Sequence, residues 1–244
     1  IFTEGCAGLP WVVDVHLGSA TGISSESSVR VRDGRFAGAG YYRSLGDVSG
    51  DGYGDMIGLY GPETSVGASL ILGSGTAIGV AGQIDLFAPR AYSAARVKPV
   101  GDVNGDGQVD FLVGGYDQAT IYSGEPTWPV IRHLDAPVRP TSYGPGEFGV
   151  YIGCSGDLNG DGYSDVLLAA PLVPLQENFG YGPGQLYLYR GTSEGVSLEP
   201  TSVVSGGGLG QRFGSESVGC LDLDGNGRAE LYVGDVGVLR PPTS

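Results

Sequence analysis

The chain has few of the residues that nucleic-acid binding, redox chemistry and metal–thiolate sites require. Its 244 residues include one lysine (Lys98), two histidines and one methionine, and 13 basic residues stand against 27 acidic ones. The net charge of −14 argues against a nucleic-acid backbone or an anionic membrane surface as partner. No apolar run approaches the roughly 18 residues of a membrane-spanning helix. The first residue is Ile1 rather than Met, which we interpret as a processed chain or part of a longer product.

Cysteine is also scarce. The three cysteines, Cys6, Cys154 and Cys220, allow at most one disulfide within the chain and leave one thiol over. The sequence leaves open which two pair, and whether they are instead small buried apolar residues. No C-x-x-C pair is present, which disfavours a zinc or redox centre of that kind.

Glycine, in contrast, is abundant. The chain has 46 glycines, far above the roughly 7% of average proteins, and they follow no collagen-like period. No stretch keeps a helical period over 11 residues, so we expect almost no helix. Short β-rich runs bounded by Gly, Pro or Ser predict many strands and tight turns instead.

Four acidic segments recur along the chain. Their first residues are Asp47, Asp102, Asp157 and Asp222. The spacings of 55, 55 and 65 residues are typical of propeller blades or a similar array. Counting strand candidates gives sixteen, or four blades of four strands. In this interpretation the strands near 11–17 and 28–32 complete a blade begun by 217–221 and 230–234, which removes the open edges.

Each segment follows the pattern D-x-[DNS]-x-[DN]-G-x-x-[DE]. Side-chain oxygens stand at positions 1, 3, 5 and 9, and Gly at position 6 permits a sharp turn. The main-chain carbonyl of position 7 is the expected fifth ligand. In the order 1, 3, 5, 7 and 9, the candidate ligands are Asp47, Ser49, Asp51, Tyr53 and Asp55 in loop 47–55; Asp102, Asn104, Asp106, Gln108 and Asp110 in loop 102–110; Asp157, Asn159, Asp161, Tyr163 and Asp165 in loop 157–165; and Asp222, Asp224, Asn226, Arg228 and Glu230 in loop 222–230.

These donors are hard oxygen atoms, which favour Ca²⁺ over zinc or copper, and their number and flexibility favour Ca²⁺ over magnesium. We therefore predict up to four Ca²⁺ ions. A solvated Asp/Gly turn would explain one such loop, but not four in phase. The second and third loops are predicted to bind most tightly, because Ser49 is a weak donor and the fourth loop uses Asn226 and Glu230 and lacks the preceding glycine.

The repeats resemble the FG-GAP repeat of integrin α-subunit β-propellers and related bacterial proteins. Phe148-Gly149 and Phe213-Gly214, each nine residues before an acidic loop, match the "FG" pair, and Ala169-Ala170-Pro171 approximates "GAP". Dockerin modules share the GDxNGDG core but place two closely spaced copies before a helix, which fits less well. The first two repeats depart from the pattern, with Phe36-Ala37 in a shifted position and Ser93-Ala94 in place of "FG".

The resemblance implies an all-β fold: a β-propeller of four-stranded blades stabilised by calcium. Residues 1–244 would form one propeller domain of about four blades, either closed or part of the seven-bladed ring usual in that family. Modest calcium sites match the roughly millimolar calcium outside cells, so we expect an extracellular, cell-surface or periplasmic location.

The expected function is adhesion or recognition, with calcium structural and a protein or glycan ligand on a cell surface or matrix. Tyrosines and tryptophans on connecting loops are candidates for ligand contacts, although for any single one of them strand packing is the favoured interpretation. A structural subunit of a larger surface assembly, completed by further blades or subunits in trans, is the first alternative. A hydrolase on a propeller scaffold is the second.

Two patterns imitate enzyme motifs. Residues 191–195 fit G-x-S-x-G, but 18–22 occupy the same place in their repeat without the central Ser, so we interpret both as hairpins. Residues 144–149 fit G-x-G-x-x-G but open no βαβ unit. His16 and His133 have no triad or metal spacing. We therefore predict that the chain is not an enzyme and has no catalytic residues. The ligand, its binding face and the source organism are not determined by the sequence.

Overall fold

A computed structural model describes the chain in segments. The described residues are 11–16, 18–25, 29–33, 41–60, 67–74, 79–85, 96–115, 118–124, 130–135, 148–149, 151–172, 183–207, 212–215 and 217–234. All the regular structure in these segments is β-strand, which confirms the all-β prediction. Within them, no helix is long and apolar enough to cross a membrane.

Three four-stranded antiparallel sheets form the middle of the chain. The first contains β5 (Tyr41–Gly46), β6 (Asp55–Tyr60), β7 (Gly67–Leu72) and β8 (Gly79–Asp85). The second contains β9 (Arg96–Gly101), β10 (Asp110–Gly114), β11 (Gln118–Tyr122) and β12 (Val130–Asp135). The third contains β13 (Tyr151–Gly156), β14 (Asp165–Ala170), β15 (Gln185–Tyr189) and β18 (Ser202–Ser205). In each sheet neighbouring strands follow the order of the chain, as in a meander.

Two-stranded sheets flank these three. The N-terminal half-sheet pairs β1 (Trp11–Val15) with β4 (Val29–Asp33), and the C-terminal half-sheet pairs β19 (Ser217–Leu221) with β20 (Glu230–Gly234). Short hairpins are formed by β2 (Gly18–Ser19) with β3 (Gly22–Ile23), and by β16 (Gly191–Thr192) with β17 (Gly195–Val196). The sixteen strands expected from the sequence are thus present, with two hairpins in addition.

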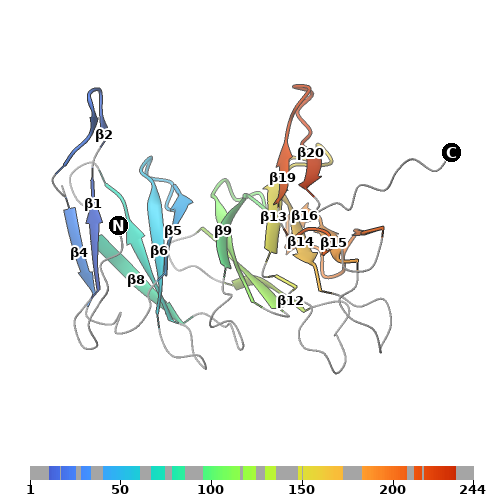
Figure 1. Cartoon of the computed structure of the whole chain (residues 1–244), viewed down its shortest axis with the longest axis horizontal. Helices are drawn as coiled ribbons and strands as arrows, with labels where there is room; N and C mark the ends of the chain where they lie inside the picture. The colour runs from blue at the N-terminus through green and yellow to red at the C-terminus, as the bar shows by residue number, and fades with distance from the viewer. Residues whose placement is uncertain are drawn as a thin grey trace.

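The first strands of the sheets, β5, β9 and β13, lie side by side with β19, so the sheets are stacked in series. Figure 1 shows this row, with β1–β4 beside the first sheet and β19–β20 beside the third. The sequence predicts that the two half-sheets complete one blade. Among the described residues they remain separate two-stranded sheets, so the structure shows no closure within the chain.

The core lies between the sheets, and alternate residues of a strand serve different neighbours. On β10, Phe111 packs in one cluster with Ile57 of the first sheet, whereas Leu112 packs in another with Val166 of the third. Successive side chains of a strand point to opposite faces, so a strand between two sheets is apolar throughout. Burying each such side chain contributes about 1.5–3 kcal/mol.

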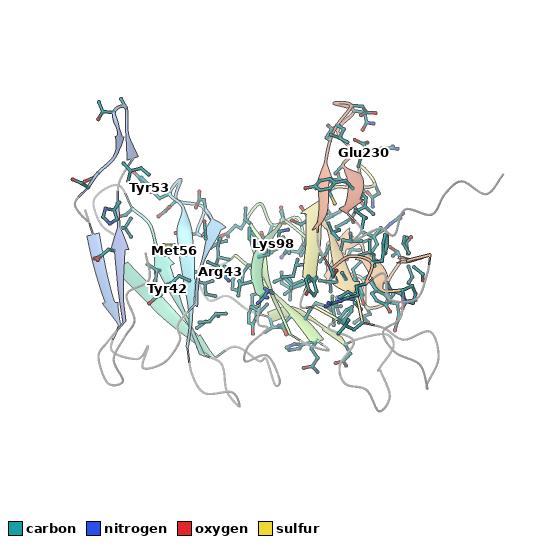
Figure 2. The ribbon with its side chains drawn as sticks, in the orientation of Figure 1. Tyr42, Arg43, Tyr53, Met56, Lys98 and Glu230 are labelled. Carbon is teal, nitrogen blue, oxygen red and sulfur yellow. The ribbon has the colours of Figure 1, made fainter. Side chains whose placement is uncertain are left out.

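Lys98 connects the second and third sheets. Its ammonium nitrogen donates to the carbonyl oxygen of Gly153 at 2.8 Å, and lies 3.4 Å from that of Ile152. Figure 2 shows the residue between the two sheets, and burial lowers the pKa of its amine. The single lysine of the chain is therefore part of the sheet-to-sheet packing.

Candidate metal-binding loops

The four acidic segments occupy equivalent places in the fold. Each connects the first strand of its sheet to the second: β5 to β6, β9 to β10, β13 to β14, and β19 to β20. Figure 2 shows Tyr53 of the first loop and Glu230 of the fourth on the same side of the row. The predicted repeat therefore places all four loops along one rim of the molecule.

Two glycines shape each loop. In the second loop Gly105 and Gly107 have φ values of +78° and +87°, in the left-handed region that other residues rarely adopt. Glycines at positions 4 and 6 of the other loops share this conformation: Gly50, Gly52, Gly160, Gly162, Gly225 and Gly227. The motif predicted from the sequence includes glycine only at position 6, although glycine also recurs at position 4 of every loop.

The aspartate at position 1 caps the turn. In the second loop, Asp102 Oδ1 accepts the N–H groups of Gly105 at 2.6 Å and Asp106 at 3.1 Å, and Oδ2 accepts that of Gly107 at 2.8 Å. Asp157 and Asp222 make the equivalent three bonds, and Asp47 makes two of them. These bonds wind the loop around one carboxylate.

Positions 3 and 5 are held beside that carboxylate. Asn104 donates from Nδ2 to Asp106 Oδ2 at 2.8 Å and accepts the Asp106 N–H at 3.0 Å. Asp106 in turn accepts the N–H of Gln108 at 2.8 Å. The third loop repeats this set. In the first loop the Ser49 hydroxyl lies 3.5 Å from Asp47 Oδ1, a longer contact.

In the first three loops, position 9 differs from the others because its acid is buried. Asp110 is fully buried; one carboxylate oxygen accepts the N–H of Val103 at 2.9 Å and the other that of Gly124 at 3.0 Å. Asp55 and Asp165 make the same two bonds, to Val48 and Gly73 and to Leu158 and Gly191. This acid therefore joins the loop to the turn that follows the third strand. These glycines could not be identified from the repeat pattern, because the number of residues between them and position 9 varies.

The charge of this acid is unfavourable without a cation. Burial raises the pKa of Asp110 to about 6, against the opposing effect of its two backbone hydrogen bonds, and the neighbouring charges of Asp106 and Asp102 raise it further. Burial likewise raises the pKa of Asp165. A bound divalent cation would offset this repulsion.

The fourth loop brings carboxylates closest together. Ligand atoms of Asp222, Asp224 and Glu230 all lie within 4.8 Å of one another. Asn226 at position 5 accepts the N–H of Arg228 at 2.8 Å, as the acid at this position does elsewhere. Oxygen donors converging in this way fit Ca²⁺. The assignment of all twenty residues as ligands, the number of ions and the ranking of the loops stay predictions.

Neighbouring loops are bonded to one another. The N–H of Ser164 in the third loop donates to the Asp102 carbonyl of the second at 2.8 Å, and the N–H of Ala229 donates to the Asp157 carbonyl at 3.3 Å. A Cβ added to Gly105 would lie 2.6 Å from the ring of Tyr163, the position-7 residue of the next loop. The second, third and fourth loops are therefore joined in series along the rim.

One of the two patterns that imitate enzyme motifs forms a hairpin. Residues 191–195 form the β16–β17 hairpin, where the Thr192 hydroxyl donates to the Gly195 carbonyl at 2.6 Å, so the hairpin interpretation is confirmed. His16 Nδ1 lies 2.9 Å from the Ser24 carbonyl oxygen, and His133 Nδ1 lies 3.0 Å from the Thr120 hydroxyl. Of residues 144–149, only 148 and 149 belong to the described part of the chain.

The two "FG" pairs fall in the core and at its border. Phe148 is buried and packs edge-on against Tyr187, with ring centroids 5.6 Å apart. Gly149 and Gly214 both have positive φ. A Cβ on Gly149 would collide with the Gln118 carbonyl oxygen, and one on Gly214 with the Leu186 side chain. Cys220 is disulfide-bonded; Cys6 and the side chain of Cys154 lie outside the described part of the chain.

Known proteins share these repeats. Residues 102–168 and 157–233 match the model of a family described as FG-GAP-like repeat. Integrin alpha-IIb of Mus musculus is 35% identical over 155 residues, which are 58% of this chain and 14% of that protein. Integrin alpha pat-2 of Caenorhabditis elegans is 27% identical over 220 residues, 80% of this chain and 18% of that protein. The chain thus spans less than a fifth of either relative.

A solved structure extends the likeness in fold. The crystal structure of rhamnogalacturonan lyase YesW aligns with a TM-score of 0.52 and 15% identity, covering 92% of this chain and 44% of that one. At this identity the likeness concerns the fold alone. This chain therefore corresponds to less than half of the length of that solved chain.

Proposed function

Because the chain belongs to the FG-GAP-like repeat family, we propose that it is a calcium-binding β-propeller segment that acts outside the cytoplasm as an adhesion or recognition module. Its three complete sheets are then three propeller blades. The ligand is a protein or a glycan on a cell surface or matrix. The observation that carries the proposal is the recurrence of one oxygen-lined loop at the same place in four successive sheets.

In this proposal the residues of the loops serve the fold. Position 1 winds the loop, positions 3 and 5 complete the oxygen set, and position 9 holds the loop to the turn beyond the third strand. Bound calcium supplies the positive charge that these carboxylates require. Its binding free energy then adds to the folding free energy.

A calcium titration tests the metal part of the proposal. We expect Ca²⁺, but not Mg²⁺ at equal concentration, to raise the unfolding temperature and to bind with micromolar to millimolar affinity. D102A should weaken this effect, because it removes the loop's central carboxylate. D135A is the matched control, since Asp135 is an exposed acid on β12 outside the loops. Equal calcium responses of the two variants would contradict the assignment.

The recognition part needs a binding screen. A glycan array and a panel of surface and matrix proteins would be probed in about 2 mM Ca²⁺, within the extracellular range, and again in EGTA. We expect the protein to bind a ligand in calcium and not in EGTA, because the calcium-loaded loops order one rim of the molecule. The absence of binding to both the glycan array and the protein panel in calcium would contradict a recognition role.

A structural subunit of a larger surface assembly is the second candidate. It is favoured by the two half-sheets, each of which has half the strands of a complete blade. Absence of catalysis stays a prediction as well. A screen with generic ester, glycoside and peptide substrates in calcium tests it, and turnover lost on mutation of a described residue would contradict it.

A further inference from the structure

Three of the four asparagines in the chain precede a glycine, and all three lie in the acidic loops. Asn104-Gly105 and Asn159-Gly160 occupy positions 3 and 4 of the second and third loops, whereas Asn226-Gly227 occupies positions 5 and 6 of the fourth. Asparagine is a thermally labile residue, and it reacts most readily before glycine, because glycine has no side chain to shield its main-chain nitrogen. The loops on both sides of the first two pairs are described, so their contacts can be compared directly.

Deamidation of an Asn-Gly pair consumes water and releases ammonia. The glycine nitrogen loses its proton to a solvent base and attacks the side-chain carbonyl carbon of the asparagine, which closes a succinimide ring. The side-chain nitrogen takes up a proton and leaves as ammonia. Water then opens the ring at either carbonyl carbon, and the product is aspartate, or isoaspartate in which the main chain continues through the side chain. The reaction therefore needs only water and the approach of these two groups.

In the second loop, carboxylates hold both of the groups that would react. The Gly105 N–H donates to Asp102 Oδ1 at 2.6 Å. The Asn104 amide donates from Nδ2 to Asp106 Oδ2 at 2.8 Å. Hydrogen bonds to an ionised acceptor are roughly twice as strong as those between neutral groups. Ring closure must break both bonds, because the glycine nitrogen keeps no hydrogen and the amide nitrogen leaves, so the folded loop opposes the reaction.

The third loop holds its asparagine in the same way. The Gly160 N–H donates to Asp157 Oδ1 at 2.6 Å. The Asn159 amide donates to Asp161 Oδ2 at 2.9 Å. Both asparagines are half-buried. In the first loop position 3 is Ser49, so this loop has acids at positions 1, 5 and 9 without an amide that could react.

We propose that Asn104 and Asn159 are deamidation sites controlled by the state of their own loops. While the loop is wound around its first aspartate, the two carboxylates hold the amide and the glycine nitrogen, and the asparagine persists. When the loop opens locally, both groups are released and the asparagine reacts. The effect of calcium rests on the proposed function, since an ion that keeps a loop wound would also slow its deamidation.

The two products would affect the loop differently. The fourth loop already has aspartate at position 3, in Asp224, so this product keeps an oxygen donor and adds negative charge beside positions 1 and 5. Isoaspartate inserts an extra main-chain atom between Asp102 and the consecutive N–H groups of residues 105–107 that Asp102 accepts. The loop could then no longer wind around that carboxylate. Deamidation would therefore leave a permanent record of the time that a loop has been open.

Peptide mapping by mass spectrometry of the 244-residue chain, incubated in EGTA, tests the role of the hydrogen bonds. D106A removes the acceptor of the Asn104 amide. We expect it to raise the deamidation rate at Asn104 about tenfold or more, the effect of losing one hydrogen bond to a charged group. The rate at Asn159 in the same molecules should not change. D51A is the matched control, because it removes the position-5 acid of the loop that has Ser49, and it should change neither rate.

A reciprocal variant and an unfolded reference complete this test. D161A should raise the rate at Asn159 and leave that at Asn104 unchanged. The wild-type chain unfolded in urea should react faster at both sites than the folded chain. Equal rates at Asn104 in wild type and D106A would overturn the proposal, as would an equal rise at both sites in each variant or equal rates in the folded and unfolded chains.

A calcium arm separates this inference from the proposed metal sites. We expect saturating Ca²⁺ to slow deamidation at both asparagines of the wild-type chain. If Ca²⁺ has no effect while D106A still accelerates the reaction at Asn104, the proposed calcium sites fail and control by the hydrogen bonds stands. If Ca²⁺ raises the unfolding temperature while D106A and wild type react alike in EGTA, the calcium sites stand and this inference fails.

Discussion

Asp110 shows why a buried acid stands at position 9 of a loop. Its carboxylate accepts N–H groups from both the loop and the next turn, from Val103 and Gly124. Those groups would have no acceptor without it, and each unsatisfied buried N–H costs about 1–3 kcal/mol. At this position the side chain supports the fold even before any cation binds.

The corresponding prediction separates structure from metal binding. In EGTA, D110A should lower the free energy of unfolding by about 2–4 kcal/mol, because it orphans two buried donors. D106A should change it by less than about 1 kcal/mol, since Asp106 is exposed. Urea unfolding measures both, and in calcium the two variants should lose the metal response alike. A larger loss for D106A in EGTA would contradict this division of roles.

Tyr187 allows a prediction of pH dependence away from the loops. Burial raises the pKa of Tyr187 from 10.0 to about 12, and its hydroxyl donates to Gln185 at 2.6 Å. The unfolded chain therefore releases this proton first, so the contribution to stability is complete below pH 10 and is lost as the pH rises through about 12. Urea unfolding of wild type and Y187F between pH 9 and pH 12 measures it. If the unfolding free energies of the two proteins changed with pH in parallel, the raised pKa of Tyr187 would be refuted.

At the scale of elements, the turn after the third strand depends on a glycine. A Cβ on Gly191 would lie 2.4 Å from the Ser164 carbonyl oxygen and 3.0 Å from that of Val103 in the preceding loop. This turn therefore sits between two acidic loops, and Thr192 donates its N–H to Val103 at 3.1 Å. The turn has no room for a side chain because the chain approaches it from both sides.

We expect G191A to destabilise the chain by about 1–3 kcal/mol, the usual cost of overpacking. G54A is the control, because a Cβ there meets nothing within 4 Å and the φ of Gly54 is not in the positive range. It should be neutral or slightly stabilising, since alanine restricts the unfolded chain. Thermal unfolding at fixed calcium compares them. Equal unfolding temperatures would show that the turn relaxes freely.

The elements themselves could largely be predicted from the sequence. The acidic loops, the apolar runs after them and the strand at Glu230–Gly234 follow from residue type and local period. The hydrogen bonds from Gly73, Gly124 and Gly191 could not be predicted. The donor and the acceptor of each bond are separated by two strands and their connection, so the number of residues between them differs from sheet to sheet. The separation of the two half-sheets could not be predicted either. The number of strands determines the number of blades, but it does not determine whether the first and last strands of the row meet.

At the scale of the whole molecule, three of the four loops are connected to one another along the rim. Backbone hydrogen bonds join the second loop to the third and the third to the fourth. Among the described residues, no backbone bond of this kind joins the first loop to the second. Loss of order in the third loop should therefore reach its neighbours on both sides, whereas the first loop should act more independently.

This difference gives a prediction for calcium coupling. D157A removes the carboxylate around which the third loop winds, so it should abolish that site and also weaken the second and fourth, whose backbone contacts run through Ser164 and the Asp157 carbonyl. D47A should remove the response of the first loop alone. The measurement is the rise in unfolding free energy between EGTA and saturating calcium, which depends on the occupancy and affinity of each site. We expect D157A to lose a clearly larger share of this rise than D47A. Equal losses would mean that the bonds along the rim carry no coupling, and that each blade binds calcium on its own.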